Sequence, residues 1–291
     1  MIKKLAILFL CLFTFSLNVN ASEISSMCAQ PHDLSWTGTK ILTNVTGMTF
    51  LSQAIANSIV KKELRKSMGS KDFKVKMKSF SAKDLADGRF KSLDINGKNL
   101  NLDGIYLSEF SASTICDFNY VKATTKTVSF KENFGMNYSM KLTEADLKKT
   151  ILSENYIKLL KSINLKMGDI NLLELKNVDV NLKDDKFLFA LNLQNTVFNY
   201  SIPFNINAAA KMKVQNGQIQ ASEITMLNKN KTVNLTQITN IINMINPLKF
   251  TANILDNSNA QVAIKTLDIK GDKLTLDGTL FIPKNTEESR K

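Results

Sequence analysis

The longest regular pattern in this sequence is the run from Ile202 to Val214, in which every second residue is apolar without a break. An apolar side chain at every second position gives an extended chain one face for a core and one for water, so the run predicts a β-strand. At about 3.3 Å per residue this strand is roughly 40 Å long, about twice the usual length. The chain is therefore expected to be built on large, twisted sheets.

Other segments repeat this pattern, and in three of them the alternation shifts by one residue. The shifts lie between Leu175 and Val178, between Ala221 and Ile224, and between Ile264 and Leu267. A strand that keeps its apolar residues on one face across such a shift needs an extra residue there, so each shift predicts a β-bulge, which bends the strand.

Apolar residues at helical spacing predict a smaller set of helices. The first runs from about Thr46 or Thr49 to Met68 and ends before Gly69, a residue typical of the position after a helix. Capping-box spacings predict helices that begin after Ser81 and after Thr143. Ser153 can restart the second of these, and another helix is expected over residues 235–245.

The N-terminus resembles a secretory signal. Lys3 and Lys4 precede an apolar stretch over residues 5–17, and cleavage is expected after Ala21. A retained N-terminal anchor is the alternative, although the stretch is short for a membrane span of about 20 residues. We therefore expect a protein that is exported, periplasmic or extracellular, and soluble after cleavage. The predicted organisation is a signal peptide (1–21), an irregular lead-in (22–44), a single domain (45–284) and a disordered tail (285–291).

The charge balance favours an anionic partner. The chain has 38 Lys and Arg against 26 Asp and Glu, a net charge of +12. Lysine predominates and few aromatic residues are interleaved with it, whereas nucleic-acid-binding proteins favour arginine and stacking aromatic rings. An anionic membrane surface or a cell-wall polyanion is the expected partner, and a charge that merely keeps the protein soluble is the alternative.

Two cysteines, Cys28 and Cys116, remain after the predicted cleavage. In an oxidising compartment an even count predicts one disulfide, which would fasten the irregular lead-in to the rest of the chain. Two buried free thiols are the alternative.

The sequence offers no catalytic motif. His32 is the only histidine, and there is no Gly-x-Ser-x-Gly, His-Glu-x-x-His, Cys-x-x-Cys or phosphate-loop pattern. Asp184-Asp185 lies between two strand patterns and is predicted to be a hairpin turn rather than a metal site. We expect no enzymatic activity, no metal and no cofactor; a hydrolase that uses only a carboxylate pair stays open, because such a pair needs no sequence motif.

Residues 91–104 and 265–278 align without gaps, with nine of fourteen positions identical. The first predicts two short strands around a turn at Asn96-Gly97, and the second predicts the same around Gly271-Asp272. Either these are two related hairpins in equivalent places of one sheet, or they are similar because hairpins draw on the same residues.

The order of these elements resembles the LmeA-like phospholipid-binding family. The likeness covers residues 50–283 and rests on the opening helix, on the short helix over 81–88 with the strands of 92–110 after it, and on the segment Leu142-Thr-Glu-Ala-Asp-Leu147. It implies an α+β fold of the tubular lipid-binding type: a long, curved, mostly antiparallel sheet wrapped around a long helix, with further short helices and an apolar channel for acyl chains.

The resemblance also implies a function. We expect non-catalytic binding or transfer of a phospholipid or another diacyl lipid in the bacterial cell envelope, without nucleic acid. The side chains expected to face the lipid are Leu51, Ile55 and Ile59 on the helix and Phe187, Phe189, Leu191 and Leu193 on a strand. Those expected to attract the anionic headgroup or membrane surface are Lys61, Lys62, Arg65 and Lys66. The alternative is a structural or protein-interaction module of the envelope, in which the same apolar residues form an ordinary filled core.

Overall fold

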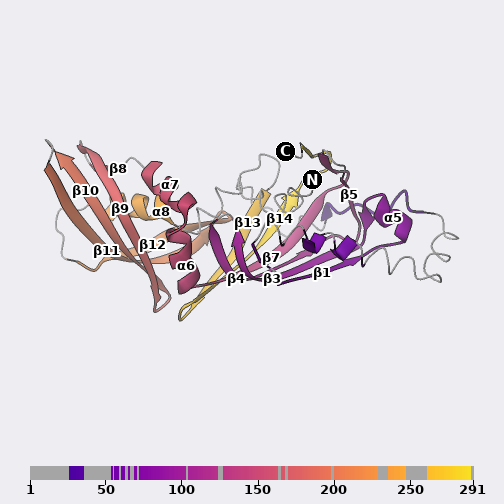
Figure 1. The fold of residues 1–291 in the computed structure, drawn as a ribbon, viewed down its shortest axis with the longest axis horizontal. Helices are drawn as coiled ribbons and strands as arrows, with labels where there is room; N and C mark the ends of the chain where they lie inside the picture. Colours follow the sequence, from indigo (N-terminus) through magenta and orange to yellow (C-terminus); the bar gives the residue numbers. More distant parts are fainter. Residues whose placement is uncertain are drawn as a thin grey trace.

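Over the residues that it describes, the computed structural model is mostly β, with fifteen strands in three antiparallel sheets (Figure 1). The described residues are 26–35, 54, 56–58, 60–62, 65, 69–70, 72–102, 104–123, 127–162, 165–167, 170–197, 200–228, 235–246 and 261–289.

The six-stranded sheet occupies the middle of the molecule (Figure 1). Its strands pair in the order β1-β3-β4-β7-β14-β13, with the bounds Phe73–Lys78, Ser92–Leu102, Ile105–Thr114, Phe134–Thr143, Lys273–Ile282 and Gln261–Lys270. One face carries buried apolar side chains such as Ile95, Met140 and Leu276, and the other carries polar ones such as Asn96, Ser139 and Lys141. This second face holds the site described below.

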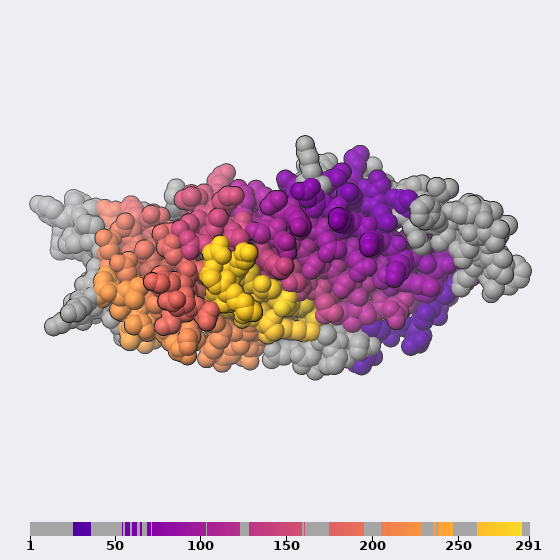
Figure 2. Space-filling model, turned by 90° about the horizontal axis from the view of Figure 1, so that it is seen from below, coloured from indigo at the N-terminus to yellow at the C-terminus, as the bar shows by residue number. Residues whose placement is uncertain are grey.

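The five-stranded sheet lies at one end of the elongated molecule (Figure 2, orange). Its strands pair in the order β12-β11-β10-β9-β8, with the bounds Gln218–Met226, Tyr200–Gln215, Lys186–Val197, Ile170–Lys183 and Leu165–Met167. The 16 residues of β11 confirm the long strand predicted from its alternation. Asp184 and Asp185, with φ of 50° and 58°, form the predicted turn between β9 and β10.

A small sheet of four short strands lies beside the six-stranded sheet. Its order is β15-β6-β5-β2, with the bounds Glu287–Ser289, Thr127–Phe130, Asn119–Ala123 and Arg89–Phe90. Residues 287–289 fall in the segment expected to be disordered; they form a strand because their backbone pairs with β6.

The helices with continuous described bounds are short: α5 (Ala82–Ala86), α6 (Glu144–Ile151), α7 (Glu154–Ser162) and α8 (Leu235–Ile245). The Ser81 and Thr143 side chains each accept a hydrogen bond from the backbone N–H three residues on, which confirms the two predicted caps. The restart after Ser153 and the bounds of α8 also follow the prediction.

Helix α6 and strand β13 connect the two large sheets. The Glu144 side chain at the start of α6 accepts a hydrogen bond from the Leu182 N–H at the end of β9, while α6 also packs on β4 and β7. The Ile264 N–H of β13 donates to the Gly217 carbonyl between β11 and β12. Buried side chains of both sheets belong to one hydrophobic cluster, so the core continues from one sheet into the other.

The expected α+β architecture, a sheet wrapped around a long helix, is wrong. Among the described residues the long strands pair with one another in separate antiparallel sheets, and no sheet encloses a long helix. Residues 54, 56–58, 60–62 and 65 are helical, as predicted, but they lie beside the six-stranded sheet (Figure 1). The five-stranded sheet is instead covered by helices α7 and α8, which pack on β9 and β12.

All three predicted bulges are present. The pairing register shifts at Lys176 in β9, at residues 223–224 in β12 and at Lys265 in β13. Lys176 and Asn177 are both exposed, while Leu175 and Val178 on either side are buried. The extra residue therefore keeps the apolar face inward, which is the reason for the shifted alternation.

The turn predicted at Asn96-Gly97 is wrong. Both residues lie within the continuous strand β3, whereas the matching segment 265–278 forms the hairpin of β13 and β14. The two similar segments are therefore not two equivalent hairpins. Gly97 does not form a turn; its missing side chain leaves space for the Phe73 ring. A Cβ atom at Gly97 would lie 2.5 Å from that ring.

Candidate functional site

Five cationic side chains line a groove on the polar face of the six-stranded sheet. The groove has a volume of about 770 Å³. Lys61 and Arg65 come from the helical residues, Lys74 from β1, Lys98 from β3 and Lys141 from β7, and the carboxylates in the lining are those of Asp72 and Glu109. The balance is strongly positive, so the groove is suited to an anionic group.

Strand register brings these side chains together. Lys98 is paired with Glu109, and Glu109 with Lys141, so the three stand in one row across β3, β4 and β7. In the next row, Lys74 is paired with Asn96 on β3, and the row continues through short side chains on β4 and β7. Directly paired residues project from the same face of a sheet, and the long lysines therefore surround a floor of short polar side chains.

Glu109 organises two of the cations. Its Oε2 atom is 2.7 Å from Lys141 Nζ, and its Oε1 atom is 3.7 Å from Lys98 Nζ. The hydrogen bond from Lys141 and the charges of both lysines hold the pKa of Glu109 below its ordinary value. One carboxylate thus lies between two ammonium groups, which leaves this row with a net positive charge. In the described part of the chain, neither Lys61 nor Lys74 forms an ion pair.

A second cavity of about 470 Å³ adjoins the groove on the same face. Its charged lining residues are Asp94 of β3, Asp277 of β14 and Lys265 of β13. Lys265 is the extra residue of the β13 bulge, and its partial burial lowers the pKa of its ammonium group. This cavity is therefore of mixed charge, in contrast to the cationic groove.

The sequence identified only part of this site. Of the four predicted headgroup residues, Lys61 and Arg65 line the groove, Lys62 is exposed outside its lining, and Lys66 lies outside the described residues. Lys74, Lys98 and Lys141 were missed. The alternating lysines of β1 were a visible signal, but the pairing of β3 with β4 and β4 with β7 cannot be read from local sequence.

The strand side chains predicted to face a lipid share one face, but they lie in a packed core. Phe187, Phe189, Leu191 and Leu193 of β10 are 0–2% exposed, and the first two rings stack with centroids 5.9 Å apart. They belong to the five-stranded sheet, whereas Lys61 and Arg65 lie on the six-stranded one. The predicted helix residues Leu51, Ile55 and Ile59 lie outside the described residues.

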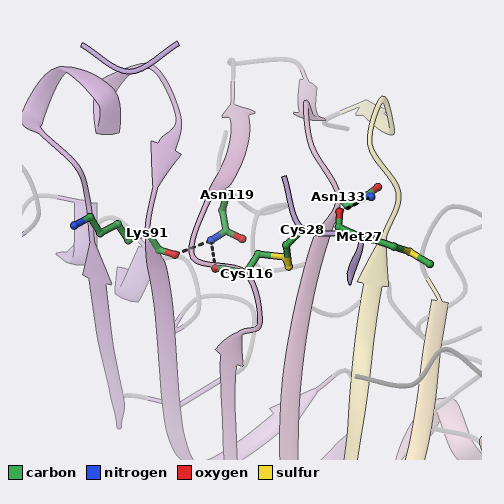
Figure 3. The surroundings of a disulfide bond; sticks show 6 residues. All are labelled: Met27, Cys28, Lys91, Cys116, Asn119 and Asn133. Atoms are coloured by element: carbon green, nitrogen blue, oxygen red, sulfur yellow. Dashed lines mark hydrogen bonds between the residues drawn. A yellow bond between two sulfur atoms is a disulfide. The ribbon is translucent and has the colours of Figure 1, made fainter. Parts of the chain in front are cut away.

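The predicted disulfide is present between Cys28 and Cys116, whose Cα atoms are 5.5 Å apart (Figure 3). The Asn119 side chain donates to the carbonyls of Cys116 and Lys91, and the Asn133 side chain donates to the Met27 carbonyl (Figure 3). These contacts hold the lead-in against the small sheet and the start of β7.

Two further contacts fix the same lead-in. The Ser35 N–H and hydroxyl both donate to the buried Asp84 carboxylate, which also accepts from the Ser81 hydroxyl. Burial raises the pKa of Asp84, but these hydrogen bonds outweigh it and the net pKa lies below the ordinary value. His32 lies 3.0 Å from Glu132 and packs against the Phe118 ring. The contacts of His32 therefore help to hold the lead-in against the rest of the protein.

The described residues contain no group of three His, Cys, Asp or Glu residues placed to hold a metal ion. No helix among them combines the length and the apolar character that crossing a bilayer requires.

Comparisons of the chain with protein-family models, with curated proteins and with solved structures give no match.

Proposed function

We propose that the protein binds an anionic phospholipid, or another diacyl lipid with an anionic headgroup, in the cell envelope without catalysing a reaction, and that it contacts the headgroup through the cationic groove. The observation that carries the proposal is the convergence of five cationic side chains from a helical segment and three strands on one groove. Lysines close to an anionic membrane contribute about 1 kcal/mol each, so a few of them suffice for measurable binding.

Export is part of the same proposal. The signal-like residues 1–21 and the disulfide between Cys28 and Cys116 support it, because disulfides persist in oxidising compartments.

The first test compares two charge-matched double variants. Lys74→Gln with Lys98→Gln removes two cations from the groove, and Lys183→Gln with Lys213→Gln removes two exposed cations from the five-stranded sheet. Binding to vesicles rich in phosphatidylglycerol is measured by co-sedimentation at low salt. The groove variant is expected to lose about 2 kcal/mol, roughly thirtyfold in affinity, while the control loses clearly less.

Equal losses in the two variants would show that only the overall charge matters, which contradicts a headgroup site in the groove. Native mass spectrometry of protein from the envelope fraction, with lipid extraction, provides the independent measurement: a bound lipid is expected. A chain that is reproducibly free of lipid and ignores anionic vesicles would refute lipid binding altogether.

A second candidate is a structural or protein-interaction module of the envelope. It is favoured by one observation, namely that Phe187, Phe189, Leu191 and Leu193 are buried in the hydrophobic core. In that case the chain is lipid-free in the mass spectra and is recovered with another envelope protein after cross-linking.

A further inference from the structure

The cationic groove and the adjoining cavity form one continuous trough. Both are lined by Asn96, Ser111 and Ser139, which come from the neighbouring strands β3, β4 and β7. Register pairs Asn96 with Ser111 and Ser111 with Ser139, and Ser139 is also paired with Asp277 on β14. A ligand can therefore extend from the cationic end to the cavity without crossing a barrier of large side chains.

The floor of the trough consists of groups that suit a hydroxyl-bearing ligand. A serine hydroxyl donates one hydrogen bond and accepts others, and an asparagine amide does both. Within the described segments, the side chains of Asn96, Ser111 and Ser139 form no hydrogen bond with the protein. They remain available to the alternating donors and acceptors of a polyol.

The far end of the trough favours the binding of hydroxyl groups over the binding of a second anion. Asp277 accepts a hydrogen bond from the Thr266 hydroxyl at 2.8 Å through Oδ2, and Asp94 lies on the same polar face. Ionised carboxylates only accept hydrogen bonds, so they bind hydroxyl donors and repel phosphate. Lys265 is the one cation that lines the described part of this cavity and it stands against two carboxylates, so a polyanion that filled the whole trough would meet a net negative charge at this end.

The length of the trough exceeds that of a single phosphate. Lys98 and Asp94 are four residues apart on β3, which corresponds to about 13 Å at roughly 3.3 Å per residue. A tetrahedral phosphate at the lysines therefore leaves the serine floor and the carboxylate end unfilled.

We infer that the trough recognises a phosphorylated polyol, with the phosphate at Lys74 and Lys98 and the hydroxyl groups on Ser111, Ser139 and Asp277. This inference rests on the proposed function and specifies the headgroup chemistry of the same site. The polyol phosphate can be the headgroup of a lipid or a free phosphate ester, since both present the same groups to the trough.

The test uses two lipids of equal charge. Phosphatidylglycerol and phosphatidylmethanol each carry one negative charge, but only the first has free hydroxyl groups. The full-length mature protein is expected to bind phosphatidylglycerol vesicles about five- to tenfold more tightly, as one or two additional hydrogen bonds would give. Isothermal titration with glycerol 1-phosphate and with methyl phosphate tests the free ester. Tighter binding of glycerol 1-phosphate would show that no acyl chain is needed. A preference for the hydroxyl-bearing compound that is seen only with vesicles would assign the ligand to lipid.

Variants locate the preference. Ser111→Ala with Ser139→Ala is expected to reduce phosphatidylglycerol binding to the phosphatidylmethanol level while phosphatidylmethanol binding stays unchanged. Asp277→Asn, which also removes one negative charge, is expected to abolish the difference in affinity between the two lipids. The control, Asn192→Ala with Thr225→Ala, alters exposed polar residues of the five-stranded sheet and is expected to keep the preference. Circular dichroism confirms that each variant is folded.

Equal binding of the two lipids by the unaltered protein would overturn the polyol inference and leave the proposed function standing. Tighter binding of phosphatidylethanolamine than of phosphatidylglycerol would also overturn it, because the carboxylates would then be selecting an amine. Failure to bind any of these vesicles would refute the proposed function itself, and the two failures are thereby distinguished.

Discussion

At the scale of single residues, Gly97 shows how one small side chain determines strand pairing. It lies in β3, one of the strands that form the cationic groove, and it is paired with Phe73 on β1 and with Phe110 on β4. Phe73 is 1% exposed, and its ring occupies the space that a Cβ atom of residue 97 would need. The Asn-Gly sequence favours a hairpin turn when only local preference counts. Packing of the Phe73 ring overrides that preference.

Replacing Gly97 by alanine should therefore destabilise the protein. The added methyl group would collide with a buried ring, and overpacking of this kind costs about 1–3 kcal/mol. Urea denaturation followed by circular dichroism measures the loss. Adding Phe73→Leu to Gly97→Ala should recover part of it, because leucine lacks the ring atoms nearest to the new Cβ. An unchanged urea midpoint in the single variant would contradict this account.

At the scale of elements, the bulges let long strands bend while their apolar faces stay buried. In β9, Leu175 is opposite Leu193 and Asn177 is opposite Asn192, so Lys176 is the extra residue of the bulge. Similar shifts occur in β12 and β13. Each of these three strands carries such a bulge, and the pairing of β9 with β8 shifts a second time, between Leu165 and Met167. Beyond the bulge at Lys176, the apolar side chains of β9 still point to the buried face.

Deletion of Lys176 should be tolerated far better than deletion of a regularly paired residue nearby. Without Lys176 the strand regains simple alternation, and Leu175 and Val178 stay on the buried face. Deletion of Asp179 instead forces a one-residue slip that turns buried side chains toward water. We expect the first variant to lose less than about 2 kcal/mol and the second to lose cooperative unfolding, both measured by urea titration. Equal losses would show that the bulge contributes nothing to register.

The elements could be predicted wherever their signal is local. Alternation gave β11, the three shifts gave the bulges, and the spacings at Ser81 and Thr143 gave the helix caps. The pairing of β7 with β14 joins residues more than 100 positions apart and leaves no local trace. For that reason the sequence indicated Lys61 and Arg65 but not Lys98 and Lys141, whose place in the groove depends on register. The predicted architecture of a sheet wrapped around a long helix was wrong for the same reason, because the assembly of sheets depends on contacts between residues that are distant in the sequence.

At the scale of the whole molecule, the lead-in is tied to the body by covalent and non-covalent contacts. The disulfide joins residues separated by 88 positions, Ser35 is bonded to the buried Asp84, and His32 contacts Glu132. These three attachments involve the loop between β4 and β5, helix α5 and the loop before β7. The lead-in therefore fastens neighbouring parts of one end of the molecule to each other.

Loss of the disulfide should lower the stability of this end markedly. Replacing Cys28 and Cys116 by alanine removes a loop closure worth about 4–5 kcal/mol in the chain-entropy model. The control, Ser35→Ala, removes the hydrogen bonds of the Ser35 hydroxyl to Asp84 and Ser81, and it keeps both the disulfide and the hydrogen bond from the Ser35 backbone N–H to Asp84. It should cost about 1–2 kcal/mol. Urea unfolding of the oxidised protein and of both variants measures these differences. A double-cysteine variant as stable as the oxidised protein would contradict the assigned role.

Strand β1 ends the order of the six-stranded sheet, and this position gives its lysines a second consequence. Lys74, Lys76 and Lys78 are exposed and alternate with Phe73, Val75 and Met77. Terminal strands invite pairing with a strand from another copy, and lysine is a common means of preventing such aggregation. If the cationic groove binds an anionic headgroup as proposed, Lys74 attracts the ligand and also keeps copies of the protein apart, and a headgroup that neutralises Lys74 weakens the repulsion between copies. The proposed function therefore predicts that ligand binding and self-association of the protein are coupled through the charge of this residue.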